Sequence, residues 1–287
     1  MELIQKAVPF AMLAFVLSSM VAMGLGLTVA QILAPLRNTR LVVLSLLANF
    51  VVMPLGALAL ASVLRLDPPM GVGLLLLGLA AGAPFLPKLA QLAKGHLAFA
   101  VGAMVLLMVV TVGYLPLVLR LLLPGVSVDP VTIARSLFLL MLLPLALALA
   151  VRARFPVMAA RSKSVLDRVS TLSLILLTLL IVVANVSNVL SIFGTRGILA
   201  GLLFIAVGFG TGWFLGGPDV DTRRVLALGT AQRNIAAALV VAGQNFSDPK
   251  VVVMVVVVAI VGLLVLMPVS RRLAVTTIQE AQLPTIK

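Results

Sequence analysis

Two basic residues lie inside segments that are otherwise apolar enough to cross a membrane. Arg233 belongs to TAQRNIAAALVVAGQN (230–245) and Lys88 belongs to GAPFLPKLAQLAKG (82–95). All eight Asp and Glu residues fall at segment ends or in connections, so neither cation has a carboxylate partner at membrane depth. Charged residues are costly in a bilayer and usually face a cavity. Because a guanidinium pairs well with carboxylate or phosphate, the two residues predict a binding site for a small organic anion.

The polar side chains near these cations complete the candidate substrate-binding set. It comprises Arg233, Lys88, Asn234, Gln232, Thr230, Asn49 and Pro87. Plainer interpretations stay open: Lys88 can extend to the membrane interface, backbone carbonyls at a helix C-terminus can neutralise Arg233, and the uncharged polar residues can join helices by hydrogen bonds. With no Cys, one His and no nucleophile–base pair or carboxylate pair inside the apolar segments, we expect no enzymatic activity, no cofactor and no metal site.

The elements that position these residues must be membrane helices. The 287 residues are 62% hydrophobic, with a mean hydropathy of +1.27, which predicts an all-α polytopic membrane protein. The net charge of +13 is explained by basic residues in cytoplasmic connections, so the expected surroundings are the lipid bilayer and no nucleic acid. The oligomeric state is left open, a monomer included.

Nine membrane spans are predicted from the apolar runs. They cover residues 7–29, 41–64, 70–93, 97–123, 130–151, 168–192, 197–216, 222–244 and 249–270. Of the 21 Lys and Arg residues, 13 fall in connections on one side and 6 on the other, the remaining two being Lys88 and Arg233. The positive-inside rule then places the N-terminus outside and the C-terminus in the cytoplasm, and a bacterial inner membrane is the simplest location.

Two of these spans carry signals for a broken helix. Pro84 and Pro87 predict a break near 83–88, with Lys88 in the first turn of the second half-helix. Gly229 and the polar residues after it predict a weaker break near 229–234. One interrupted span in each half of the chain indicates an inverted-repeat transporter with its site at the midplane. The expected repeats are 1–124 (spans 1–4) and 125–287 (spans 5–9), within a single transmembrane unit.

Several motifs occur in the order typical of one transporter family. They are MGLGLT (23–28), ANFVVMPLGALAL (48–60), LAKGH (92–96), VG (101–102) and GTAQRNIAAALVVA (229–242). On these motifs the chain resembles the bile acid:sodium symporter family over nearly its whole length. The resemblance implies a panel domain and a core domain, with the two broken helices crossing in the core. It also implies transport of organic anions by alternating access.

The positions that would hold sodium in such a family depart from its pattern. The Ser-Asn pair of the first broken helix falls at Leu86 and Pro87, and the hydroxyl ligands of the next helix fall at Ala100 and Met104. The family's glutamate falls at Gly229, and its two glutamines fall at Arg233 and Asn49. The hypothesis is therefore that Lys88 and Arg233 replace the two sodium ions with fixed positive charge. Transport would then be uniport, exchange or proton-coupled.

Three functions remain after these observations. The first is a sodium-independent transporter of small organic anions, with 2-oxo and hydroxy carboxylates as examples. The second is a sodium-coupled symporter of organic anions or bile acids. The third is a membrane receptor that binds an anion without moving it. The sequence does not choose the anion or the direction of transport.

Overall fold

The computed structural model describes residues 2–122, 129–184 and 196–282. These residues form helices joined by short connections, with no strand among them. Seven helices in this part are long and apolar enough to cross a membrane: Ala7–Gly26, Thr39–Val63, Leu97–Leu122, Pro130–Arg154, Gly197–Leu215, Val220–Asn245 and Pro249–Ala274. The prediction of an all-α polytopic membrane protein is thereby confirmed, whereas the count of nine spans stays a prediction.

The helices follow one another closely along the chain. The first half contains α1 (Glu2–Gly26), α2 (Val29–Leu33), η1 (Ala34–Arg37), α3 (Thr39–Leu47), η2 (Ala48–Val52), α4 (Met53–Val63), α5 (Pro68–Leu79), α6 (Leu86–Leu92) and α7 (Leu97–Leu122). The second half contains α8 (Pro130–Leu137), η3 (Phe138–Leu142), α9 (Leu143–Arg154), α10 (Pro156–Ala184), α12 (Gly197–Leu215), α13 (Val220–Ala231), α14 (Ile235–Asn245) and α15 (Pro249–Gln282).

Two predicted spans take a different form in the structure. The predicted span 70–93 is divided between α5 and α6, which are too short to cross a bilayer separately. The predicted span 168–192 belongs to α10, which begins twelve residues earlier, at Pro156, and is described to Ala184. Residues 185–192 of that span lie outside the described residues.

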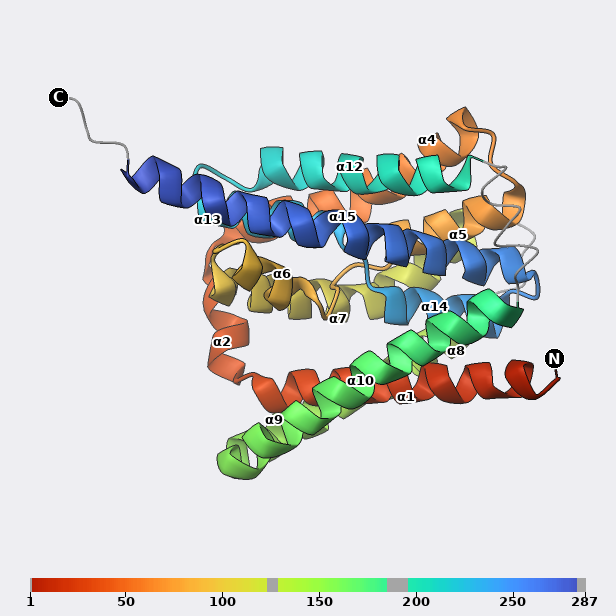
Figure 1. Ribbon diagram of the computed structural model, residues 1–287, viewed down its shortest axis with the longest axis horizontal. Helices are drawn as coiled ribbons and strands as arrows, with labels where there is room; N and C mark the ends of the chain where they lie inside the picture. The colour runs from red at the N-terminus through yellow and green to blue at the C-terminus, as the bar shows by residue number, and fades with distance from the viewer. Residues whose placement is uncertain (1, 123–128, 185–195, 283–287) are drawn as a thin grey trace.

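The helices form two groups (Figure 1). In one group α1 packs against both α9 and α10. The other group, the main bundle, contains the remaining long helices and the short helices α5, α6, α13 and α14. α8, which continues through η3 into α9, contacts α7 and α14 of the main bundle, and Met12 of α1 lies against Gly243 of α14. The division into a panel and a core, and the inverted symmetry of the two halves, stay predictions.

Glycines bring α12 unusually close to α13. Gly208, Gly212 and Gly216 recur every four residues and so lie on one face of the helix. A Cβ atom at Gly212 would lie 2.2 Å from the backbone oxygen of Leu226 and 2.5 Å from the Cα atom of Ala227. The backbone of α13 therefore rests directly on α12, which holds the first half of the second broken span in a fixed position.

Candidate ion and substrate site

Both predicted breaks are present, and they lie close to the predicted positions. The chain leaves the helical conformation after Leu79 and resumes it at Leu86, so the first break begins a few residues earlier than predicted. Gly82 explains the earlier start, because its φ of 79° lies in the left-handed region. The second break separates Ala231 from Ile235. As predicted, Lys88 lies in the first turn of the second half-helix, α6.

Asn234 joins the two breaks. Its backbone N–H donates to the Ala80 oxygen at 2.9 Å, and its side-chain amide donates to the oxygens of Ala81 and Gly82 at 3.3 and 3.2 Å. Pro84 has no N–H, so the Ala80 oxygen would otherwise lack a helical donor. The Asn234 side-chain oxygen also caps α14 by accepting from Ala237, at 3.1 Å. One asparagine thus ties the start of α14 to the connection between α5 and α6.

The point where the two breaks meet is called the crossing below. Arg233 is buried beside it, and its guanidinium donates hydrogen bonds to four protein oxygens. Nε donates to the Leu77 oxygen at 2.8 Å, and one terminal nitrogen donates to the Gly78 oxygen at 2.8 Å. The other terminal nitrogen donates to Oδ1 of Asn49 at 2.7 Å and to the backbone oxygen of Thr230 at 3.1 Å. The three carbonyls belong to the last turns of α5 and α13, where the helix dipole is negative. The geometry therefore favours neutralisation of Arg233 by helix C-termini.

Asn49 reaches this arginine from a widened helical turn. It lies in η2, a π-helical turn, and its amide donates to the Ser45 oxygen at 3.0 Å and to the Thr230 hydroxyl at 3.3 Å. Pro54 cannot donate to the Phe50 oxygen four residues before it, which explains why the turn widens here. Asn49, Thr230 and Arg233 are all buried. They form a network, which we call the arginine network, that links η2 to the last turns of α5 and α13.

Apolar side chains pack where the family resemblance would place the glutamate and the serine. A Cβ atom at Gly229 would lie 2.8 Å from Cδ2 of Leu86, so the leucine side chain rests directly on the glycine. Leu86, Ala100 and Met104 are all buried. The positions where the family resemblance would place a glutamate and a serine are therefore in contact, and neither carries a side-chain oxygen.

Lys88 is not part of this buried cluster. It is exposed at the surface of the protein on α6, and Pro87 beside it is half-buried. The hypothesis that Lys88 and Arg233 replace the two sodium ions therefore meets a different arrangement at each of the two positions. Arg233 binds Asn49, another position to which the resemblance assigns a sodium ligand, whereas the Leu86–Gly229 contact, and not Lys88, lies at the second set of positions that the resemblance implies.

Gln232 occupies the end of α13. Its backbone N–H donates to the Leu228 oxygen at 2.8 Å, and its side chain is buried facing Gly262 of α15. Of the seven predicted binding residues, the structure thus brings together Arg233, Asn49 and Thr230. Asn234 holds the neighbouring crossing, and Lys88 and Pro87 lie on α6 outside the buried cluster.

Two polar residues of α7 support the site and were missed by sequence reasoning. The Thr111 hydroxyl accepts from the Ala81 N–H at 3.0 Å and donates to the Ala81 oxygen at 3.2 Å. The Tyr114 hydroxyl donates to the Phe50 oxygen, the group that Pro54 leaves without a helical partner. Their signal in the sequence is isolated polar residues in the apolar run VVTVGYLP (109–116).

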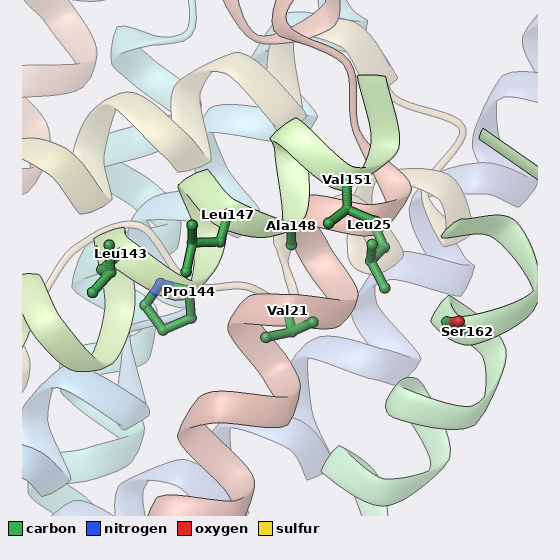
Figure 2. A pocket seen from close by; sticks show the side chains of 8 residues that line it. All are labelled: Val21, Leu25, Leu143, Pro144, Leu147, Ala148, Val151 and Ser162. Carbon is green, nitrogen blue, oxygen red and sulfur yellow. The ribbon is translucent and has the colours of Figure 1, made fainter. Parts of the chain in front are cut away.

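Two cavities occur in the structure, and neither is lined by a residue of the arginine network. Figure 2 shows the first, of about 350 Å³, between α1, α9 and α10; it is lined by Val21, Leu25, Leu143, Pro144, Leu147, Ala148, Val151 and Ser162. The second, of about 390 Å³, is lined by Val43, Leu46, Leu47, Phe50, Val51, Val110 and Tyr114. No charged side chain lines either cavity, so neither offers a partner for a carboxylate.

Comparisons with known proteins point to one transporter family. The model of the Sodium Bile acid symporter family matches residues 12–195. A similar protein, the probable sodium/metabolite cotransporter BASS2, chloroplastic, of Oryza sativa subsp. japonica, is 27% identical over 240 residues. That alignment covers 82% of this chain and 57% of the rice protein, so the chain spans little more than half the length of its relative. The family match includes the first broken helix and ends before the second.

Proposed function

The chain belongs to the sodium bile acid symporter family, and from this premise we propose that it is a secondary transporter of small organic anions, mainly carboxylates. In this proposal it works by alternating access and without sodium. The main bundle would move against the group of α1, α9 and α10 while carrying the substrate. The proposed setting is a bacterial inner membrane, with the N-terminus outside and the C-terminus in the cytoplasm.

The observation that carries the proposal is the position of the Arg233 guanidinium. The family resemblance assigns sodium ligands to positions 49 and 233, and the guanidinium binds the Asn49 side-chain oxygen and the Thr230 carbonyl oxygen. A small cation is bound in proteins by oxygen atoms of this kind. Because an arginine stays protonated in proteins, it supplies a permanent cation to these oxygens. A sodium ion at this position would be repelled by the guanidinium, and the oxygens that could bind it already accept hydrogen bonds.

Apolar packing at the second position supports the same conclusion. Leu86 lies against Gly229 in place of two oxygen-bearing side chains. A sodium ion at this point would be surrounded by hydrocarbon, and an unpaired charge in such surroundings is strongly disfavoured. Loss of sodium coupling therefore fits both positions.

Lys88 is the residue best placed to attract the substrate. It is exposed on the first turn of α6, next to the crossing, whereas the hydrogen bonds of Arg233 are directed to protein oxygens. We therefore assign direct contact with the carboxylate to Lys88, and a supporting electrostatic role to Arg233.

A sodium-coupled symporter is the second candidate function. The printed name of the rice relative, a probable sodium/metabolite cotransporter, favours it. In that case sodium would have to bind through backbone oxygens elsewhere in the main bundle, because Arg233 holds those of Leu77, Gly78 and Thr230.

Uptake into proteoliposomes tests the proposed function. We expect labelled pyruvate, lactate or 2-oxoglutarate to enter at the same initial rate with an inward gradient of sodium or of choline, because no sodium ion takes part. Empty liposomes give the background. A rate that depends on sodium would favour the second candidate, and absence of uptake with all three probes would contradict the proposed substrate class.

Lys88 variants in the same assay test the assignment of the substrate contact. Lys88→Gln is expected to raise the KM about tenfold, the effect of losing about 1.4 kcal/mol of binding free energy. Lys88→Arg keeps the charge and is expected to retain most of the affinity. Arg120→Gln, which removes an exposed cation from α7, is the matched control and is expected to leave the KM unchanged. Equal KM values for Lys88→Gln and the wild type would contradict the assignment.

A further inference from the structure

Transport without sodium has a consequence for the direction of transport. Resting on the function proposed above, we propose that this carrier is electrogenic, moves the negative charge of its substrate without a compensating cation, and exports organic anions from a cytoplasm that is electrically negative. The structural basis is that the cation at the crossing is covalently part of the chain.

The Arg233 guanidinium cannot leave with the substrate. Its hydrogen bonds join the last turn of α5, the last turn of α13 and Asn49 of η2, all within the main bundle. A bound sodium ion is released on the far side of the membrane in each cycle and so delivers positive charge. A tethered guanidinium returns with the bundle, so it transfers no net charge over a complete cycle.

The described helices also offer no carboxylate at membrane depth that could carry a proton with the substrate. Acidic residues in the described helices occur at their starts or caps, as with Asp67, Asp129 and Asp219, in the polar first half of α10, or near the end of α15. His96 precedes α7, where its Nδ1 accepts from the Phe99 N–H at 3.1 Å. Within the described residues there is no group of three His, Cys, Asp or Glu side chains that could hold a metal ion. In this proposal no proton accompanies the substrate, so the charge of the substrate is the net charge that crosses the membrane.

The membrane potential therefore sets the direction of transport. Moving one elementary charge across about 100 mV changes the free energy by about 2.3 kcal/mol. Since about 1.36 kcal/mol corresponds to a factor of ten, a monovalent anion reaches about a 50-fold gradient towards the positive side. A divalent anion reaches the square of this ratio, about 2,500-fold. In a cell with a negative interior, such a carrier releases carboxylates that metabolism produces inside.

Imposed potentials in proteoliposomes test this inference. Potassium gradients with valinomycin set the vesicle interior positive or negative, in sodium-free buffer at equal internal and external pH. We expect labelled pyruvate to accumulate when the interior is positive and to be excluded when it is negative, and 2-oxoglutarate to respond with twice the logarithmic slope. The equilibrium distribution does not depend on the orientation of the protein in the vesicle.

The possible results distinguish a failure of this inference from a failure of the proposed function. Sodium-independent uptake that ignores the potential would indicate electroneutral exchange or proton coupling, and would overturn the inference while leaving the proposed function intact. Faster uptake with a negative interior would overturn it as well, because a co-transported cation would then be needed. Sodium-dependent uptake, or no uptake of either probe, would contradict the proposed function itself.

Lys88→Arg provides a control for a proton carried by the lysine. Arginine keeps the positive charge but does not release a proton in proteins. The ratio of pyruvate accumulation at positive and negative interior potential is expected to be the same in Lys88→Arg and the wild type. A change from a potential-independent wild type to a potential-dependent variant would show that Lys88 carries a proton, and would overturn the inference.

Discussion

Replacement of Arg233 by glutamine is expected to lower the free energy of unfolding by about 3–5 kcal/mol and to abolish carboxylate transport. The substitution leaves the buried oxygens of Leu77 and Gly78 without their charged donor. It also removes the cation that offsets the negative ends of α5 and α13. The last turns of α5 and α13 then lose a donor that they share, so we expect the proposed substrate site to lose its geometry.

The thermal midpoint of the purified protein in detergent measures this effect. Arg196→Gln is the matched control, because Arg196 is exposed and donates a hydrogen bond to the Leu64 oxygen at 3.2 Å; its midpoint should stay close to that of the wild type. Arg233→Lys keeps the charge but loses the planar fork, so an intermediate midpoint is expected. If Arg233→Gln matched the wild type in midpoint and transport, the arginine network would have no role.

Replacement of Gly82 by alanine is expected to cost about 4 kcal/mol or more and to leave little folded protein. Gly82 has a φ of 79°, which an alanine adopts only with strain. A Cβ atom there would also lie 2.3 Å from the backbone nitrogen of Met108 and 2.7 Å from the backbone oxygen of Met104. Both atoms belong to the backbone of α7, so no side-chain rotation relieves the contact.

Gly113→Ala is the matched control for this prediction. Gly113 lies on α7, and a Cβ atom there would have no neighbouring atom within 4 Å. Alanine is favoured over glycine inside a helix by about 0.5–1 kcal/mol, so the yield and thermal midpoint of Gly113→Ala should equal or exceed those of the wild type. A Gly82→Ala variant that is as stable and as active as Gly113→Ala would contradict the close approach of the first break to α7.

The breaks show what the sequence could predict about the fold. Pro84 and Pro87 indicate the first break because proline cannot continue the backbone hydrogen bonds of a helix. Its start after Leu79 could not be predicted, because it depends on the left-handed φ of Gly82 and on donors from Asn234 and Thr111. These partners come from helices that are distant in the sequence, so local patterns do not contain them.

The site was only partly predictable for the same reason. Arg233, Asn49 and Thr230 stand out as polar residues in apolar spans, and the structure joins them in one network. Whether Arg233 binds a substrate or helix C-termini depends on which carbonyls lack a donor, and this is decided where the last turns of α5 and α13 meet at Arg233. The depth of Lys88 was also undetermined, because composition alone does not tell which face of α6 is covered.

Sodium binding tests the central claim most directly, namely that the Arg233 guanidinium stands where a sodium ion would bind. The measurement is the thermal midpoint of the wild-type protein in NaCl and in choline chloride at equal concentration. A ligand that binds the folded state at about 100 times its Kd stabilises it by about 2.7 kcal/mol. We predict the same midpoint in both salts, because the guanidinium and the Leu86–Gly229 contact fill both positions. A midpoint that rises with sodium concentration and saturates would contradict the claim.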